Sequence, residues 1–433
     1  MNGFMIAAPH SGAGKTMVTL GLLRALRNRG VALAAAKAGP DYIDPAFHAA
    51  ASGGGCVNLD PWGMRGDLIR ANVSRITEGE KSLVVEAMMG LFDAAADGRG
   101  SAADLAALLR LPVVLVIDVS RMAHSVAALA KGFRDHRPDL FMAGVVANKT
   151  GSERHVRMLR EALEPEGLRL LGAIPRDERL VLPERHLGLV QAGEHAALED
   201  FIAHAAQTME KHCDMAQFSA IRVPAPQAAP ANVPRVPPLA QHIAVARDEA
   251  FAFAYAHLLD GWQRRGVTLS FFSPLADEGP AGDAGAVYLP GGYPELHGAT
   301  IAAADRFHAG MAAARDRGAT IYGECGGYMA LGAGLTDADG TRHRMLGLLP
   351  LETTFANRRR HLGYRRLKPL TGLFNGAPLT GHEFHYTTVV TEGPGDPLFA
   401  VEDAVGADLG ATGLVNGPVC GSFMHVIDIV EQA

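Results

Sequence analysis

One cysteine of this chain lies in a sequence context that could make it a nucleophile. Cys325 follows the apolar stretch Ala319–Tyr322 and precedes Tyr328–Leu331, which resembles the start of a helix. Gly326 and Gly327 lie between them and permit the sharp strand-to-helix turn that exposes a nucleophilic side chain. A helix N-terminus also lowers the pKa of a thiol. The segment therefore predicts a reactive thiol, and the alternative is a buried structural cysteine.

A thiol that attacks a carbonyl needs oxyanion donors and a base. Gly291 and Gly292, in the segment L-P-G-G-Y-P-E, follow another apolar stretch. Their backbone N–H groups, with that of Gly326, are predicted to form an oxyanion hole. His425, in the apolar C-terminal segment, is the candidate base among 18 histidines. These residues together predict a thiol hydrolase site.

A second motif, A-P-H-S-G-A-G-K-T at residues 8–16, predicts a phosphate-binding loop. It follows an apolar stretch and opens an amphipathic helix, so that backbone N–H groups and the helix N-terminus can surround an anion. Pro9 stands where this motif usually begins with glycine. The alternative is a glycine-rich turn with a fortuitous Lys-Thr pair. The predicted nucleotide-binding residues are Gly12, Ala13, Gly14, Lys15 for the outer phosphates, and Thr16, whose hydroxyl can bind Mg²⁺.

Charged residues follow the next predicted strand, in K-A-G-P-D-Y-I-D-P at residues 37–45. Lys37 could stabilise the charge of a phosphoryl group during transfer, and Asp41 could complete a Mg²⁺ shell beside Thr16. Asp44 lies on the same short loop, as does Tyr42, which is a candidate for substrate binding. Taken alone, such a loop is more often solvated surface.

Two other strand ends carry polar candidates. Glu86 ends an apolar run, where a buried carboxylate needs a metal or a partner, and Asp93 follows on the next loop. We interpret Glu86 as a metal ligand, whereas the alternative is a strand-end salt bridge. Asn148 ends a further strand and could read a nucleotide base with its side-chain amide.

Short apolar runs alternate with helical patterns over the first 200 residues, which predicts a doubly wound parallel sheet. The expected strands are Phe4–Ala7, Val31–Ala36, Leu83–Glu86, Val113–Ile117 and Ala143–Ala147, and the expected helices include Thr16–Asn28, Ala102–Arg110 and His124–Phe133. A second alternating series, Ile243–Ala246, Leu269–Phe272, Ala286–Leu289 and Thr320–Tyr322, predicts a second α/β domain. Between them, proline-rich residues 223–240 are interpreted as a semi-rigid linker, or alternatively as a long surface loop. The predicted domains are 1–222 and 241–433.

Composition limits the classes of partner. The 433-residue chain has a net charge of −6, which offers no electrostatic case for nucleic acid or an anionic membrane. No run is long enough to span a membrane, and we recognise no signal peptide. Four widely spaced cysteines suit a reducing compartment, so we expect a cytoplasmic protein.

These motifs together resemble the cobyrinate or hydrogenobyrinate a,c-diamide synthases of cobalamin biosynthesis. The resemblance runs nearly end to end and includes the stretches 8–16, 37–45, 84–93, 289–295, 322–329, 363–365, 381–386 and 422–425. It implies a dethiobiotin-synthetase-like ATPase domain joined to a class I glutamine amidotransferase-like domain. It also implies ATP- and glutamine-dependent amidation of two ring carboxylates, with Mg²⁺ and a homodimer.

Further residues are assigned through this resemblance. Four acidic residues match positions that the family uses for metal and for substrate activation, which implies catalytic roles for Asp41, Asp44, Glu86 and Asp93. The stretch 363–365 and the stretch 381–386 resemble second-domain segments, which implies a ring site or a domain interface there. The candidate substrate residues are Arg358, Tyr364, Glu383 and His385. Arg358 begins a basic run that would suit a polycarboxylate, or alternatively forms a solvated turn. Many triad glutaminases carry glutamate two residues after the histidine, but this chain has Ile427 there and Asp428 next. A Cys–His pair is therefore expected, and the third residue stays open.

Three alternatives remain at this point. Cobyric acid synthases amidate other side chains of the ring, but they carry K-P-x-N-M where this chain has K-A-G-P-D-Y-I-D-P. A related activity on a nickel tetrapyrrole is the second alternative. The third is a P-loop partitioning or regulatory ATPase with an inert Cys325, although His10 occupies the position of the additional loop lysine found in such proteins.

Overall fold

A computed structural model describes residues 2–181, 184–185, 188–189, 197–223 and 232–430. The chain divides into two compact units, Met1–Val233 and Pro234–Ala433. Residues 224–231 of the expected linker lie outside the described part, so the linker stays a prediction. Each unit is described by itself below.

The first unit is built on a seven-stranded sheet in which every neighbouring pair is parallel. The strand order is β3-β2-β4-β1-β5-β6-β7, and the expected doubly wound parallel sheet is therefore confirmed. The strands are β1 Gly3–Ala7, β2 Leu33–Ala38, β3 Cys56–Leu59, β4 Ser82–Glu86, β5 Val113–Asp118, β6 Met142–Thr150 and β7 Leu170–Pro175.

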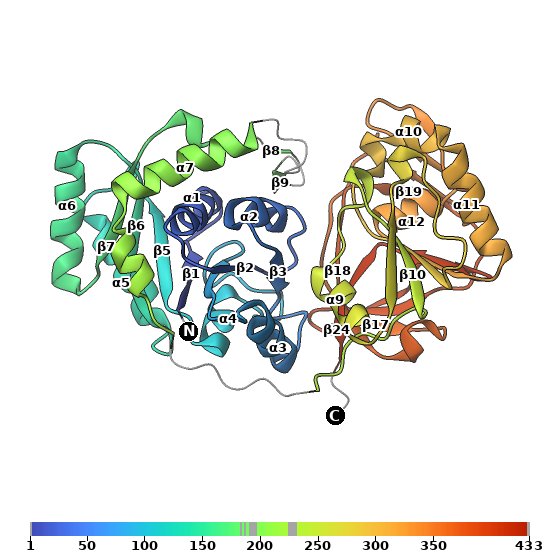
Figure 1. Cartoon of the computed structure of the whole chain (residues 1–433), viewed down its shortest axis with the longest axis horizontal. Helices are drawn as coiled ribbons and strands as arrows, with labels where there is room; N and C mark the ends of the chain where they lie inside the picture. The colour runs from blue at the N-terminus through green and yellow to red at the C-terminus, as the bar shows by residue number, and fades with distance from the viewer. Residues whose placement is uncertain (1, 182–183, 186–187, 190–196, 224–231, 431–433) are drawn as a thin grey trace. The chain divides into compact units, whose positions relative to one another are not determined.

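Helices cover both faces of this sheet (Figure 1). They are α1 Lys15–Asn28, α2 Asp44–Ser52, α3 Gly66–Ile76, α4 Ala102–Leu109, α5 Ser125–His136, α6 Glu153–Leu163, α7 Leu198–His212 and α8 Met215–Ala220. Short 3₁₀ turns occupy Glu164–Glu166 and Glu178–Leu180, and β8 Glu184–Arg185 pairs with β9 Gly188–Leu189. A capping box starts α4, because Ser101 and Asp104 each accept a hydrogen bond from the other's backbone N–H.

Strands β3 and β7 were not predicted. Strand β3 has only four residues and includes Asn58, whose polar side chain interrupts the apolar run. Strand β7 contains Gly172 and ends in Pro175, which are both uncommon inside strands. The other five strands agree with the apolar runs to within a few residues.

The strand order places the predicted nucleotide-binding loops beside one another. Strands β2, β4 and β1 are adjacent, and all three run in the same direction. The loops that follow them therefore leave the same edge of the sheet, which is where ligands bind in open α/β sheets. These loops carry the phosphate loop, residues 37–45 and Glu86.

The second unit contains a six-stranded sheet with the order β11-β10-β12-β13-β23-β22, parallel except at β22. Its strands are β10 His242–Ala246, β11 Thr268–Phe272, β12 Ala286–Leu289, β13 Thr320–Glu324, β22 Leu414–Asn416 and β23 Val419–Ser422. Its helices are α9 Ala256–Arg264, α10 Gly298–Ala303, α11 Asp305–Asp316 and α12 Gly326–Leu331, with 3₁₀ turns at Glu249–Phe251, Pro274–Ala276, Pro294–Leu296 and Leu373–Gly376.

Two more sheets complete this unit, and the sequence did not predict them. One has the order β15-β14-β16-β19, with β14 Gly334–Thr336, β15 Arg342–Arg344, β16 Leu351–Thr354 and β19 Thr388–Glu392. The other is antiparallel, with the order β21-β20-β17-β18-β24, and consists of β17 His361–Pro369, β18 Leu379–His385, β20 Phe399–Asp403, β21 Asp408–Thr412 and β24 Met424–Ile429. Strand β24 follows β23 directly and brings His425 opposite His382 of β18.

Within the described ranges, none of the helices combines the length and the apolar character that a membrane crossing requires. All four cysteines are free thiols, and three of them are buried.

Candidate functional site

The phosphate loop has the backbone that anion binding needs. Gly12 and Gly14 have φ angles of 80° and 99°, which glycine adopts readily and other residues rarely adopt. A Cβ on Gly14 would also lie 2.2 Å from Asn148 Nδ2, so a larger residue there would displace this side chain. Helix α1 begins at Lys15, directly after the loop. The geometry matches a helix N-terminus prepared for phosphate.

Asn148 contacts the loop itself. Its Nδ2 donates a hydrogen bond to the carbonyl of Ala13 at 2.9 Å, and its Oδ1 accepts one from Lys149 N at 3.0 Å. These contacts hold Asn148 against the phosphate loop and support the shape of that loop. Recognition of a nucleotide base by Asn148 remains a prediction.

Lys15 lies at the base of the loop with its ammonium 3.3 Å from the carbonyl of His10. Burial lowers the pKa of Lys15, and the nearby charge of Lys37 lowers it further, whereas Glu86, Asp44 and Asp93 act in the opposite direction. A phosphate anion would supply the counter-charge that this buried lysine partly lacks.

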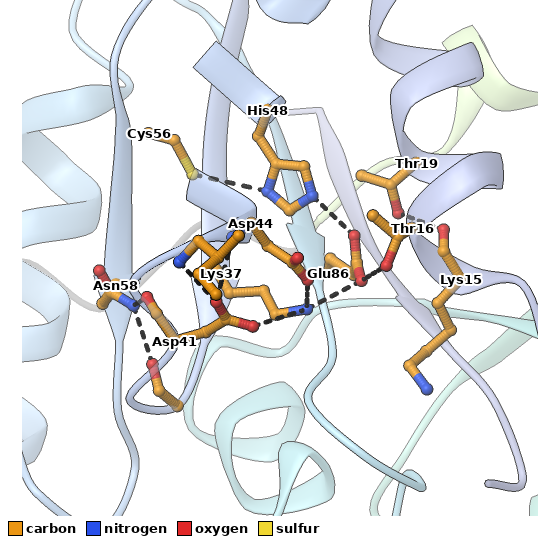
Figure 2. A network of polar contacts seen from close by, with 12 residues as sticks. Lys15, Thr16, Thr19, Lys37, Asp41, Asp44, His48, Cys56, Asn58 and Glu86 are labelled. Atoms are coloured by element: carbon orange, nitrogen blue, oxygen red, sulfur yellow. Dashed lines mark hydrogen bonds and ion pairs between the residues drawn. The ribbon is translucent and has the colours of Figure 1, made fainter. Parts of the chain in front are cut away.

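A buried network of charges forms beside the loop, with Lys37 at its centre (Figure 2). The Lys37 ammonium lies 2.5 Å from Asp44 Oδ2, 2.8 Å from Glu86 Oε1 and 3.7 Å from Asp41 Oδ2. Burial by itself would lower the pKa of Lys37, but the carboxylates outweigh it and raise the pKa well above its usual value. Burial, and then the neighbouring Asp41, raise the pKa of Asp44 to about 7.

Glu86 receives three donors at the end of β4. Its Oε1 accepts hydrogen bonds from Thr16 Oγ1 and Lys37 Nζ, both at 2.8 Å, and its Oε2 lies 2.6 Å from His48 Nε2. Burial would raise the pKa of Glu86, but Lys37 and His48 outweigh this effect and hold the pKa far below its usual range. Glu86 is therefore an ionised, fully enclosed carboxylate.

His48 belongs to this site, and the sequence analysis missed it. It lies on α2 one turn after Asp44 and is fully buried. The spacing of four residues from a candidate aspartate on one helix was the available signal. Burial would lower the pKa of His48, but Glu86, with Cys56 at 3.7 Å, raises it to about 10. The imidazole is therefore charged at neutral pH.

The remaining predicted residues of this unit take different positions. Asp41 Oδ1 accepts hydrogen bonds from the backbone of Ile43 and Asp44, which shapes the turn before α2. Asn58, on the unpredicted β3, holds the same loop through the carbonyl of Asp41 at 2.6 Å. Tyr42 is half-buried, whereas Asp93 is exposed and accepts a bond from Gly90 N at 2.7 Å. Asp93 thus lies outside the buried network.

The oxygen atoms at this edge fit a hard cation. Thr16 Oγ1 and Glu86 Oε1 are 2.8 Å apart, and hydroxyl and carboxylate oxygens are the ligands that Mg²⁺ takes. The Lys37 ammonium is bonded to the same carboxylate oxygen, so a cation ligated by Oε1 would have to replace this contact. The metal role of Thr16, Asp41 and Glu86 stays a prediction that this set of donors supports.

A pH-dependent stability follows from the His48–Glu86 pair. Because the pKa of His48 rises from 6.5 to about 10 on folding, its stabilising effect is complete below about pH 6.5 and is lost as pH rises through about 10. In Mg²⁺-free buffer, His48→Gln is expected to lower the unfolding temperature most at pH 6. The difference in the free energy of unfolding between His48→Gln and wild type should narrow by on the order of 1 kcal/mol per pH unit toward pH 10.

The matched control is His124→Gln, because His124 is exposed at the start of α5. Its difference from wild type should stay near zero at every pH. A deficit in His48→Gln that is unchanged between pH 6 and pH 10 would show that His48 is not protonated in the folded protein.

In the second unit, Cys325 occupies the turn between β13 and α12 with φ 48° and ψ −104°. This conformation is strained for a residue other than glycine, as expected for a nucleophile on a sharp strand-to-helix turn. A Cβ on Gly326 would lie 2.8 Å from Gly292 N, and one on Gly327 would lie 2.0 Å from the carbonyl of Leu289. Both glycines are thus required by the close approach of the loop after β12.

His425 lies at the same place. A Cβ on Gly291 would lie 2.3 Å from His425 Cε1, 3.2 Å from His425 Nε2 and 3.3 Å from Cys325 Cβ. The imidazole of His425 and the Cβ of Cys325 therefore both lie close to the backbone of Gly291. The structure brings together the predicted thiol, the predicted base and the three glycines Gly291, Gly292 and Gly326.

The pKa of the Cys325 thiol differs from the lowered value that the sequence predicted. Burial raises the pKa of the Cys325 thiol well above its usual value, and the charge of Glu295 adds to this effect, whereas a hydrogen bond from Gly326 N–H opposes it. The predicted lowering by the helix N-terminus is therefore outweighed. Burial, and then His382 and His385, lower the pKa of His425 to about 3. The resting pair is a thiol and a neutral imidazole, which is suited to general-base catalysis.

Residues of β18 border this thiol. The carbonyl of Phe384 lies 3.8 Å from Cys325 Sγ, and His385 stacks on Phe423 with ring centroids 4.1 Å apart. Glu383 accepts bonds from Arg365 at 2.7 Å and contacts His385 at 3.1 Å. Glu383 and His385, which were assigned to the substrate ring or to an interface, thus lie in the neighbourhood of the Cys–His pair.

Two other candidate substrate residues lie on or near β17. Tyr364 is half-buried, and its ring meets that of His382 edge-on at 5.3 Å. Arg358 is exposed in the turn before β17. Their binding of a substrate ring stays a prediction.

The two units together define an ATP-dependent glutamine amidotransferase class of enzyme. One has a phosphate loop at the carboxyl edge of a parallel sheet, and the other has a Cys–His pair on a strained turn. Residues 4–190 match the CobQ/CobB/MinD/ParA nucleotide binding domain, and residues 242–430 match the CobB/CobQ-like glutamine amidotransferase domain. The fold predicted for each unit is confirmed.

Curated relatives narrow this class. The chain is 63% identical over 434 residues to the hydrogenobyrinate a,c-diamide synthase of Brucella anthropi, and 60% identical to that of a Sinorhizobium species, with both chains covered completely in each case. It is 50% identical to the enzyme of the same name from Rhodobacter capsulatus over 98% of each chain. The chain belongs to the hydrogenobyrinate a,c-diamide synthase family.

Proposed function

We propose that this enzyme uses ATP and glutamine to amidate the a and c carboxylates of hydrogenobyrinic acid in cobalamin biosynthesis. The observation that carries the proposal is the presence, in one chain with full-length synthase relatives, of both the Lys15–Thr16–Lys37–Glu86 cluster and the Cys325–His425 pair. The relatives' name favours the metal-free ring over cobyrinic acid.

The first reaction activates a ring carboxylate. A carboxylate oxygen attacks the γ-phosphorus of ATP, the bond to the β-phosphate oxygen breaks, and ADP leaves. Catalysis of such a transfer is mainly positioning and charge stabilisation. Lys15 holds the outer phosphates, and Lys37 stabilises the charge on the transferring group. Asp41, Asp44 and Asp93 are proposed to position the reacting carboxylate and these lysines.

The second reaction supplies ammonia and uses it. His425 takes the proton of the Cys325 thiol, the sulfur attacks the side-chain amide carbon of glutamine, and the nitrogen leaves as ammonia with a proton from His425. Backbone N–H groups of Gly291, Gly292 and Gly326 stabilise the oxyanion. Water then releases glutamate from the thioester. Ammonia attacks the acyl phosphate, and inorganic phosphate leaves.

The proposal includes Mg²⁺ on the oxygen atoms of Thr16 and Glu86, with Asp41 as a further ligand. When bound, this ion would neutralise phosphate charge. It also includes a homodimer and a cytoplasmic location, for which the support is the family resemblance and the four free cysteines.

The test is a mass-spectrometric assay with ATP, Mg²⁺ and glutamine, offering hydrogenobyrinic and cobyrinic acids in parallel. We expect two carboxylates of hydrogenobyrinic acid to become amides. Amidation of the cobalt ring alone would overturn the choice of substrate. No mass change on either ring, in protein shown to bind ATP, would favour another tetrapyrrole or a regulatory P-loop ATPase.

A further inference from the structure

A second buried carboxylate, Glu324, lies beside the Cys–His pair. It ends β13, directly before Cys325, and is 1% exposed. Its Oε2 accepts a hydrogen bond from Tyr288 at 2.7 Å, and its Oε1 accepts one from Tyr322 at 3.0 Å and another from Val426 N at 3.1 Å. Three donors therefore hold the carboxylate in one orientation.

The carboxylate of Glu324 also lies close to the base, His425. Glu324 Oε2 lies 3.8 Å from His425 Nδ1, within the range of an ion pair. The backbone gives a second connection, because Glu324 Oε1 accepts a hydrogen bond from Val426 N, and Val426 directly follows His425. Glu324 thus directly precedes the nucleophile Cys325 in the chain and accepts a hydrogen bond from the residue that follows the base His425.

Packing makes this arrangement rigid. Tyr288 and Tyr322 are paired in register on β12 and β13, and their rings stack with centroids 5.9 Å apart. Burial, and then the charge of Glu324, raise the pKa of both phenols well above the usual value, so both remain hydrogen-bond donors at neutral pH. Such a fully satisfied polar group is fixed more firmly than a solvated carboxylate.

Asp428 lies three residues after His425 on β24, where it is paired with Thr380 of β18 beyond an irregularity in the register. Its Oδ1 accepts a bond from Ile429 N at 2.8 Å. Ile427, two residues after His425, has no polar side chain.

We propose that Glu324 is the positioning residue for His425, accepting a hydrogen bond from Nδ1–H so that Nε2 can take the thiol proton. The proposal rests on the glutaminase role of Cys325. The contact shortens from 3.8 Å when glutamine binds, since catalytic hydrogen bonds are often long in the unliganded enzyme. When His425 becomes an imidazolium, the carboxylate stabilises it, as the third member of a catalytic triad does.

The charges around the pair make this stabilisation necessary. His382 and His385 face His425 and disfavour its positive charge. Glu324 is the carboxylate held against its ring, and burial raises the pKa of Glu324 to about 7 while the two tyrosines and Val426 N act against this effect. The carboxylate is therefore partly ionised at neutral pH and becomes more so above it.

The experiment compares Glu324→Gln with Tyr322→Phe. Glu324→Gln keeps the size of the side chain but removes its charge. Tyr322→Phe removes one donor to Oε1 and leaves Oε2, the oxygen that lies 3.8 Å from His425 Nδ1, with its bond from Tyr288. We expect Glu324→Gln to lower the kcat of glutamine hydrolysis about 100-fold, with the KM for glutamine within about threefold of wild type and with ammonia-driven amidation unchanged. Tyr322→Phe should lose less than about tenfold.

A second readout does not depend on the ring substrate. The rate of Cys325 alkylation by iodoacetamide, followed by mass spectrometry of its peptide, reports the thiolate at each pH. The charge of Glu324 by itself raises the pKa of Cys325, whereas a hydrogen bond from His425 Nδ1 to Glu324 would favour the imidazolium that accompanies the thiolate. The proposal requires the second effect to be the larger, so that removal of Glu324 moves the alkylation midpoint upward. Wild type that alkylates normally but hydrolyses no glutamine would contradict the proposed function and leave this measurement valid.

Three outcomes would overturn the inference. The first is glutamine hydrolysis by Glu324→Gln within about threefold of wild type. The second is an alkylation midpoint that is unchanged or moves downward. The third is an equal loss of kcat in both variants with an equal fall in unfolding temperature, because this would show that Glu324 acts only through the stability of the fold.

Discussion

Cys325→Ala should reduce glutamine-dependent amidation by at least about 10³-fold while ammonium chloride still supports amidation near the wild-type rate. The substitution removes the sulfur that attacks glutamine, and nothing in the first unit changes with it. The buried side chain is small, so the turn between β13 and α12 should keep its shape. Parallel assays with glutamine and with ammonium chloride, followed by mass spectrometry of the ring product, measure both rates.

Cys420→Ala is the matched control for this experiment. Cys420 is a buried free thiol on β23 and is paired in register with Tyr322 of β13, so it tests the loss of a thiol from the same sheet. It should keep both activities. Loss of amidation with both glutamine and ammonium chloride in a folded Cys325→Ala protein would contradict separate chemistry in the two units. Retention of glutamine use would show that another group is the nucleophile.

The ionisation of Cys325 explains why its neighbours matter as much as the sulfur. An isolated thiol with a raised pKa is a poor nucleophile, and burial raises this one. The neutral imidazole of His425 can remove the proton if its ring is held in the correct orientation. The site therefore protects the thiol at rest and depends on orientation for its reactivity.

The parts of the fold that follow a local pattern could be predicted from the sequence. Strands β1, β4 and β5 are continuous apolar runs, and the phosphate loop is defined by glycine and lysine spacing within nine residues. Their parallel alignment then follows from the alternation with helices. Glu86 was identified as a buried strand-end carboxylate because this requirement is visible in the local sequence as well.

What was missed depends on contacts between distant residues. His48 reaches Glu86 across 38 positions in the chain, and only the packing of α2 on the sheet reveals the pair. Glu324 ends a buried strand as Glu86 does, and the same reasoning would have singled it out. Its partner Val426 lies 102 positions away and is placed by the antiparallel sheet, whose strands lack a clear alternation of apolar and polar residues.

Lys15→Ala should remove amidation with both glutamine and ammonium chloride, by about 10³-fold or more in each case. Carboxylate activation comes before either nitrogen source is used, and Lys15 is the phosphate-loop lysine at the start of α1. Glutamine hydrolysis by Cys325 in the absence of the ring should remain, because that chemistry belongs to the other unit. The measurements are ADP release, ring amidation and glutamate release in one set of reactions.

Lys131→Ala provides the control, because Lys131 lies on α5 with its ammonium in an exposed ion pair to Glu166. Such a surface pair contributes at most about 1 kcal/mol, so all activities should persist. The Lys15 and Cys325 variants then form a complementary pair. One keeps glutamate release and loses amidation from every nitrogen source, and the other loses glutamate release and keeps amidation from ammonia. Ammonia-driven turnover that survives in Lys15→Ala would mean that the Lys37 network, and not the phosphate-loop lysine, carries the charge stabilisation of phosphoryl transfer.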